Sequence, residues 1–336
     1  MQLKSLGEFG LIKHLTKNIP VYDRTVVLGI GDDAAAFKVS EDNFVLITCD
    51  MLIEGHHFIL NKITPWQLGY KSLAVNLSDI AAMGGVPRHS VISIGWPDYV
   101  DLAYTENFYD GFKELAGQFG VNILGGDTVK APQLVINVTV IGEIDRYPIT
   151  RKGALPGDVI AVTGRLGASG AGLDLIRSED ALAILPGDVY RNLTNAHLIP
   201  VPRMLEARVL AASGSVTAMI DISDGLASEI NHIAAESNVG AIIYADLLPV
   251  DGDTKLAGEK LNKDYRQWAL FGGEDYELLF TLPAAKVSSI RDALGDQGVG
   301  FTIIGDVCPK KTGVLLASKD GKTPLPGHGY NHFKMD

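Results

Sequence analysis

The sequence contains only two cysteines, Cys49 and Cys308, which lie far apart in the chain. So few cysteines argue against a disulfide framework, and their spacing is not that of metal ligands. The start of the chain lacks the apolar core of a secretory signal, and no stretch approaches 18 consecutive apolar residues. We therefore expect a cytoplasmic protein with no membrane-spanning segment.

Positive charge is also scarce, because 29 lysines and arginines stand against 40 acidic residues, for a formal net charge of −11. No long basic run interrupts this excess, so neither nucleic acid nor an anionic membrane is an expected partner. An acidic protein that binds phosphates must offset its own negative charge. Divalent cations are the usual means.

Common phosphate-binding and catalytic motifs are missing too. There is no Walker A sequence, no protein-kinase loop signature, and no zinc-type spacing among the eight histidines. The glycine-rich run GRLGASGAG (164–172) could cradle a phosphate at the start of a helix. It could equally allow a strand–helix turn to pack closely, and the sequence leaves both interpretations open.

What the chain does contain is enough hydrophobic sequence for two cores. Its 336 residues are 46% hydrophobic, and strand-like and helix-like segments intermix in both halves. This pattern predicts two α/β domains, of the α+β sandwich type with mixed sheets. The turn-rich stretch TRKGALPGD (150–158) suggests a boundary, which gives domains over 1–148 and 149–336.

Two helices are predicted with defined ends. Thr64 is a plausible N-cap, Pro65 occupies the first helical position, and Gln67 completes a capping box, so one helix should run from there to the glycines at 84–85. A second helix is predicted over 106–119.

A recurring pattern carries the chemistry: a hydrophobic strand reaches Gly, Ser or Thr and then Asp. It occurs at 31–33, 48–50, 125–127 and 221–224. We expect these carboxylates to sit at strand tips and to converge, which requires cations between them. Ligand sets made only of oxygen favour Mg²⁺. The alternative is that each aspartate merely caps a helix or turn. Asp79 is different, because it is predicted inside a helix, where Asp is a poor helix former; its alternative is a solvated helical turn.

With these residues collected, the chain resembles the thiamine-monophosphate kinase family over essentially its whole length. That family belongs to a wider ATP-binding superfamily that includes aminoimidazole ribonucleotide synthetase. The matching segments are GEFGLI (7–12), GIGDDAA (29–35), EGHHF (54–58), KSLAVNLSDIAAMGG (71–85), ILGGDT (123–128), TRKGALPGD (150–158), DISDGL (221–226) and GGEDYELLFT (272–281).

The resemblance implies transfer of the ATP γ-phosphoryl group to thiamine monophosphate, which yields thiamine diphosphate. It also implies a homodimer whose N-terminal domains, each a mixed sheet with helices, pair near the ATP site, and a C-terminal α/β sandwich. The acceptor phosphate is already ionised, so direct in-line transfer needs no general base, and we expect no phospho-enzyme. The alternatives are another ATP-dependent synthetase of the superfamily and a non-catalytic protein that binds nucleotide or thiamine phosphate.

The resemblance also implies a site, with no covalent nucleophile. Several Mg²⁺ ions would be bound by Asp33, Thr48, Cys49, Asp50, Asp79, Asp127, Asp221 and Asp224, of which Asp50, Asp127 and Asp224 would stabilise charge during transfer. ATP would contact Tyr109, Gly126, Asp127, Arg151 and Ser223. The substrate would contact His57, Glu274 and Tyr330. Cys49 departs from the family, which usually has a hydroxyl residue there. A thiol is a poor Mg²⁺ ligand, so either the backbone carbonyl binds or one metal site is altered.

Overall fold

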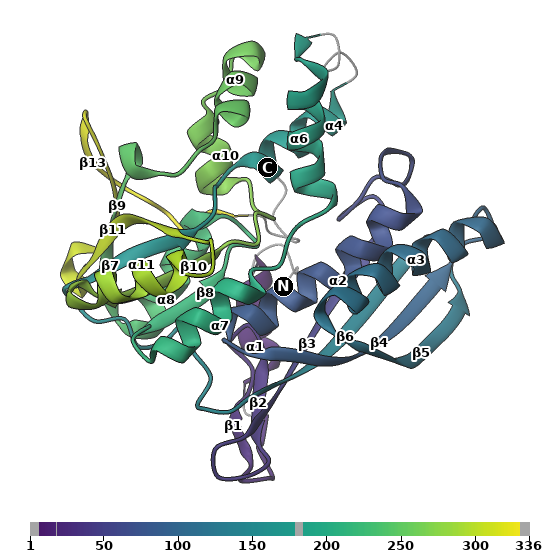
Figure 1. Cartoon of the computed structure of the whole chain (residues 1–336), viewed down its shortest axis with the longest axis horizontal. Helices are drawn as coiled ribbons and strands as arrows, with labels where there is room; N and C mark the ends of the chain where they lie inside the picture. The colour runs from purple at the N-terminus through teal and green to yellow at the C-terminus, as the bar shows by residue number, and fades with distance from the viewer. Residues whose placement is uncertain (1–6, 18, 179–183, 330–336) are drawn as a thin grey trace.

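The computed structural model describes residues 7–17, 19–178 and 184–329. Two β-sheets organise these residues, and helices pack against both (Figure 1). Across these ranges, no helix combines the length and the apolar character that crossing a membrane requires.

The N-terminal sheet has six strands in the order β1-β2-β3-β6-β4-β5. Only β4 and β5 pair in parallel, so the sheet is mixed, as predicted. Helices α2 and α3 cover one face (Figure 1). The elements of this half are α1 (Gly7–Leu15), β1 (Val26–Leu28), β2 (Ala35–Lys38), β3 (Phe44–Ile53), α2 (Pro65–Ala82), β4 (Val86–Trp96), α3 (Leu102–Phe119), β5 (Asn122–Lys130) and β6 (Val135–Ile144).

Local signals explain where the two long helices begin. The capping box predicted at Thr64 is present: the Thr64 hydroxyl accepts a hydrogen bond from the Gln67 backbone N–H, and the Gln67 side chain accepts one from the Thr64 backbone. Helix α3 starts four residues earlier than the predicted start at 106, because Asp101 acts as its N-cap and accepts a hydrogen bond from the Tyr104 backbone.

The C-terminal sheet has seven strands in the order β13-β12-β9-β11-β7-β10-β8. All neighbours pair antiparallel except β12 and β9. Its elements are β7 (Asp158–Thr163), α4 (Ala168–Arg177), α6 (Gly187–Leu198), α7 (Met204–Ser213), β8 (Ala218–Asp221), α8 (Leu226–Ser237), β9 (Val239–Tyr244), α9 (Gly252–Leu261), α10 (Tyr265–Phe271), β10 (Leu278–Pro283), α11 (Val287–Gly295), β11 (Phe301–Pro309), β12 (Val314–Ser318) and β13 (Gly321–Pro324). The domain division at 148/149 stays a prediction.

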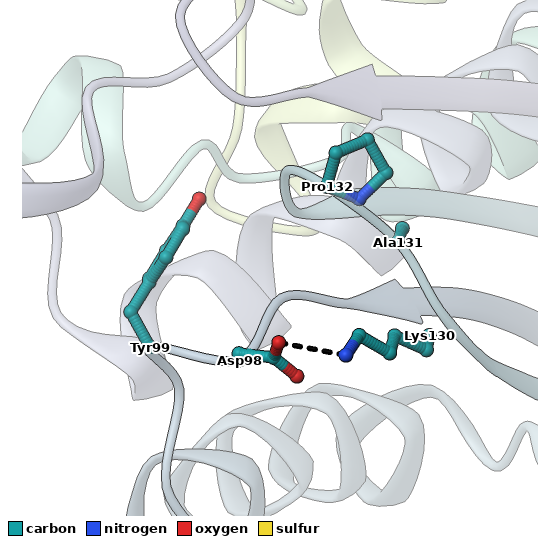
Figure 2. Close-up of a pocket in the computed structure, with 5 residues that line it drawn as sticks. All are labelled: Asp98, Tyr99, Lys130, Ala131 and Pro132. Carbon is teal, nitrogen blue, oxygen red and sulfur yellow. Dashed lines mark ion pairs between the residues drawn. The ribbon is translucent and has the colours of Figure 1, made fainter.

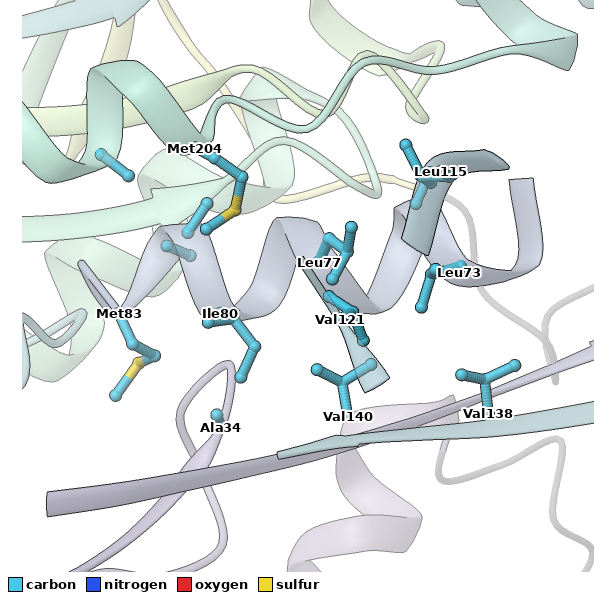
Figure 3. Close-up of a cluster of buried hydrophobic side chains, with 14 of the residues drawn as sticks. Ala34, Leu73, Leu77, Ile80, Met83, Leu115, Val121, Val138, Val140 and Met204 are labelled. Carbon is cyan, nitrogen blue, oxygen red and sulfur yellow. The ribbon is translucent and has the colours of Figure 1, made fainter. Parts of the chain in front are cut away.

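One hydrophobic core runs across both halves, with α2 at its centre. Ile80 of this helix lies toward the strands that carry Val138 and Val140, while Met204 of α7 lies on the opposite side of the same helix (Figure 3). Because α2 is buried on nearly every side, a polar residue within it can only face a neighbouring element or an internal site. The buried polar residues of α2 therefore indicate where the candidate site lies.

Candidate functional site

Three carboxylates from distant parts of the chain meet beside α2. Asp33 precedes β2, Asp79 belongs to α2, and Asp221 ends β8, yet one carboxylate oxygen of each lies within 4.8 Å of those of the other two. Oxygen Oδ2 of Asp33 is buried and has no hydrogen-bond partner in the described part of the chain. Both halves of the molecule therefore contribute to one compact acidic cluster.

Hydroxyl groups orient two carboxylates of this cluster, and an amide holds the backbone of the neighbouring Asp50. The Thr48 hydroxyl donates a hydrogen bond to Asp79, and the Ser78 hydroxyl donates one to Asp221 at 2.5 Å. Asp50 is held through its backbone N–H, which donates to the Asn76 side chain at 3.0 Å. Because β3 alternates its side chains, Thr48 and Asp50 both face α2.

Burial and mutual repulsion make these groups reluctant to ionise. Burial, followed by the negative charge of Asp33, raises the pKa of Asp221 to about 8 and that of Asp50 to about 6. Burial also raises the pKa of Asp79 well above its usual value, with repulsion from Asp50 and Asp221 adding to the effect. A bound cation would remove both penalties, because it neutralises the charge and supplies a partner.

Arg151 is the positive charge next to the cluster. Its guanidinium Nη2 lies 2.5 Å from Asp33 Oδ1, and its backbone N–H donates to Asp32 Oδ2 at 3.3 Å. Burial alone would lower the pKa of Arg151, but Asp33 and Asp32 raise it, so it remains a fixed cation. The structure thus places this predicted ATP ligand against a predicted metal ligand.

Asp224 and Ser223 lie on the C-terminal side of the cluster. Helix α8 has Gly225 at its N-cap with no side-chain cap, so Asp224 does not cap it in the manner of the alternative interpretation. Instead, its backbone N–H donates to Glu229 at 3.0 Å. Burial, together with Glu8, raises the pKa of Asp224 to about 7. The Ser223 carbonyl accepts a hydrogen bond from the Glu274 backbone at 2.7 Å, which ties this segment to the loop at 272–277.

The expectation that every aspartate sits at a strand tip is wrong for Asp50 and Asp127. Strands β3 and β5 continue past them to Ile53 and Lys130. Strand alternation then separates the two aspartates. Asp127 shares a row across the sheet with Ser93 and Asn137 on the face opposite α2.

Other predicted ligands also lie on opposite faces of the N-terminal sheet. Cys49 lies on the face of Asp127, where its sulfur is 3.2 Å from the Asn137 side-chain nitrogen. Gly126 falls in the row of Asp50, and no larger residue fits there, because a Cβ would lie 1.6 Å from the carbonyl oxygen of Ile92. Tyr109, on α3, packs edge-on against Phe108. Cys49 and Asp127 therefore lie on the face of the sheet opposite α2, away from the cluster.

Two hollows lie on the N-terminal half, outside the acidic cluster. One, of about 500 Å³, lies near the ends of β4 and β5, where Asp98 and Lys130 form an ion pair of 2.7 Å (Figure 2). A second, of about 360 Å³, lies on the face opposite α2. The second hollow contains a predicted ligand, Asp127, together with Met51, Ser93 and Asn137.

Among the predicted substrate residues, Glu274 is held by two buried side chains. Its carboxylate Oε2 lies 2.9 Å from Lys71 Nζ and 3.0 Å from His197 Nδ1. His57 lies in the turn after β3, where its Nδ1 accepts a hydrogen bond from the Ile53 backbone at 3.0 Å. Tyr330 lies outside the described residues.

The glycine-rich run at 164–172 is explained by packing and by an internal anion. A Cβ at Gly172 would lie 2.0 Å from the carbonyl oxygen of Leu193. The Asp275 carboxylate accepts hydrogen bonds from the backbone of Gly167 at 2.9 Å and of Ser169 at 3.4 Å. The N-terminus of α4 is thus occupied by the chain's own carboxylate, where the sequence had also allowed a phosphate.

Sequence reasoning missed several polar residues of α2. Lys71, Asn76 and Ser78 each contact a site group, and all three are buried. A detectable signal was present: polar residues recur along a helix whose apolar positions leave no solvent-facing side. Such a helix must bury polar groups, and buried polar groups need partners.

Comparisons with known proteins identify the family of the chain. The models "AIR synthase related protein, N-terminal domain" and "AIR synthase related protein, C-terminal domain" match residues 31–144 and 156–317. Thiamine-monophosphate kinase of Bacillus subtilis (strain 168) is 37% identical, covering 98% of this chain and 100% of the relative. That of Escherichia coli (strain K12) is 38% identical, covering 97% and 98%. A solved structure of AaThiL complexed with AMPPCP and TMP superposes with a TM-score of 0.84 at 34% identity, covering 99% of each chain. The chain belongs to the thiamine-monophosphate kinase family.

Proposed function

We propose that the chain phosphorylates thiamine monophosphate with ATP by direct in-line transfer, assisted by Mg²⁺ bound at Asp33, Asp79 and Asp221. The relatives' names supply the reaction, and the solved structure of a relative with AMPPCP and TMP supports the two substrates. The observation that carries the Mg²⁺ assignment is the convergence of three carboxylates within 4.8 Å.

The donor set fits a hard divalent cation. Every candidate ligand in the cluster is an oxygen, and Asp33 Oδ2 is buried without a partner in the described ranges. We add Asp50, Asp224 and Thr48 to the set as neighbours of the cluster. When bound, Mg²⁺ would neutralise phosphate charge and polarise the γ-phosphoryl oxygens.

The chain's own residues would orient and neutralise the reactants. Arg151, fixed against Asp33, provides a rigid cation for a nucleotide phosphate. Thr48 and Ser78 fix the directions of the Asp79 and Asp221 carboxylates. Because the acceptor oxygen is already anionic, none of these residues has to remove a proton.

We also infer a homodimer formed through the face of the N-terminal sheet opposite α2, which would bring Asp127 toward the ATP site near the interface. This face is partly apolar, and Met51 on it is 49% exposed. Met51→Asp should shift the mass measured by analytical ultracentrifugation from dimer to monomer, whereas Val39→Asp, an exposed control in another segment, should not. A monomeric wild-type chain would contradict the inference.

The activity is tested with purified protein, ATP and thiamine monophosphate, with free thiamine as the comparison substrate. We expect thiamine diphosphate only with thiamine monophosphate, and only when Mg²⁺ is present. ATP binding without turnover at saturating Mg²⁺ would contradict the proposal and favour a binding protein. We infer a cytoplasmic location, since the reaction consumes ATP and both cysteines are free.

A further inference from the structure

Lys71, His197 and Glu274 form a buried polar triad where the two halves meet. Lys71 comes from α2, His197 from α6, and Glu274 from the loop at 272–277. Lys71 is 1% exposed, and its ammonium group lies 2.9 Å from Glu274 Oε2 and 3.4 Å from His197 Nε2. A lysine this deeply buried needs a paired anion, and Glu274 is that anion.

One arrangement of protons accounts for the contacts of Lys71: with His197 Nε2 unprotonated, Lys71 donates to Glu274 Oε2 and to Nε2. The ring proton of His197 is then on Nδ1, which lies 3.0 Å from the same Oε2 and 3.1 Å from the Ser169 hydroxyl. Burial and Lys71 lower the pKa of His197, which keeps its ring neutral, as this arrangement requires. Burial opposes ionisation of Glu274, but Lys71 and His197 hold its pKa well below the usual range.

All these contacts are made by one oxygen of Glu274. Within the described part of the chain, no hydrogen bond involves Oε1, and the side chain is 24% exposed. Oε2 of the carboxylate is therefore held by two side chains, and Oε1 is available to a ligand. This is the geometry expected of a group that receives a ligand rather than one that only stabilises the fold.

The loop that carries Glu274 is also held in an unfavourable backbone conformation. Glu274 and Tyr276 have φ values of +54° and +50°, in the left-handed region that favours glycine. Flanking acids anchor the loop: Asp275 accepts hydrogen bonds from the start of α4, and Glu277 accepts two from Arg203 at 2.6 Å. Holding the loop in this conformation costs free energy, and the result is a fixed position for the Glu274 carboxylate.

We propose that Lys71 and His197 are positioning residues that fix the Glu274 carboxylate so that Oε1 faces a cationic or hydrogen-bond-donating group of the substrate. The inference rests on the proposed function, in which Glu274 contacts thiamine monophosphate. Because Lys71 belongs to the N-terminal half, substrate recognition then depends on contact between the halves.

The test compares Lys71→Met, Lys71→Arg and Glu274→Gln, with KM measured separately for thiamine monophosphate and for ATP. Lys71→Met should raise the KM for thiamine monophosphate about tenfold, the ratio that corresponds to the loss of one modest interaction, and should leave the KM for ATP and kcat nearly unchanged. Lys71→Arg should restore most of the affinity. Lys263→Met is the control, since it removes an exposed ion pair with Asp174 elsewhere in the C-terminal half.

The outcomes separate the two proposals. No change in KM for Glu274→Gln would overturn the substrate role of Glu274 itself. A raised KM for Glu274→Gln with a normal KM for Lys71→Met would overturn only the positioning role, as would equal effects on both substrates. If Lys71→Met does not fold, His197→Gln gives the same test: a selective rise in the KM for thiamine monophosphate supports the inference, and an unchanged KM refutes it.

Discussion

Replacing Asp221 with Asn should stabilise the Mg²⁺-free protein near pH 8 while abolishing its activity. Asp221 is 2% exposed, and burial together with the charge of Asp33 raises its pKa from 3.8 to about 8. At 1.36 kcal/mol for each pKa unit, this shift corresponds to about 6 kcal/mol of unfavourable free energy for the ionised group. Neighbouring carboxylates share the protons, so we expect the substitution to recover roughly 2 to 4 kcal/mol.

The sign of the pH dependence follows from the direction of the shift. Folded Asp221 keeps a proton at pH values where the unfolded chain has lost it, so its contribution to stability is present below about pH 4. That contribution is lost progressively as the pH rises to about 8. The neutral amide of the variant carries no such penalty, and the Ser78 hydroxyl can still donate to its side-chain oxygen. The stability advantage of Asp221→Asn should therefore grow with pH.

The assay is urea unfolding of both proteins in EDTA, near pH 5 and near pH 8, repeated near pH 8 with Mg²⁺. Added Mg²⁺ should stabilise the wild type more than the variant, because the cation needs the carboxylate that the variant lacks. Asp246→Asn, at an exposed aspartate in the short helical turn after β9, serves as the control. A variant less stable than the wild type near pH 8 in EDTA would refute the reasoning, as would an advantage that does not change with pH.

Three further predictions concern the two faces of the sheet and the chemistry. Asp127→Asn should abolish turnover and change the free energy of unfolding by less than about 0.5 kcal/mol, since the side chain is exposed; near-normal kcat would show that Asp127 has no role at the ATP site. Gly126→Ala should lower the free energy of unfolding by about 3 kcal/mol or more, because its Cβ would overlap the carbonyl oxygen of Ile92; Gly117→Ala, with open space around it, is the control, and equal stability of the two variants would contradict this account. Radiolabelled γ-phosphate should appear in thiamine diphosphate and never on the protein, whereas a labelled protein band after denaturing electrophoresis would show a covalent intermediate.

Local sequence determined the features that depend on neighbouring residues. The capping box at Thr64 was readable because its partners lie within one helical turn. The acidic segments and the family resemblance also singled out three carboxylates that the fold brings together, Asp33, Asp79 and Asp221. The start of α3 was missed, although its cap, Asp101, is equally local.

Tertiary structure alone decided which groups face one another. Whether Asp50 and Asp127 lie on the same or opposite faces depends on strand alternation and register, which no single segment reveals. Lys71 and Glu274 are separated by 203 positions, and the sequence around either residue does not indicate the ion pair. The physical reason is that a buried charge must be paired, and its partner is the opposite charge that the packed fold places within contact distance. For Lys71 that pairing exists only when both halves enclose helix α2.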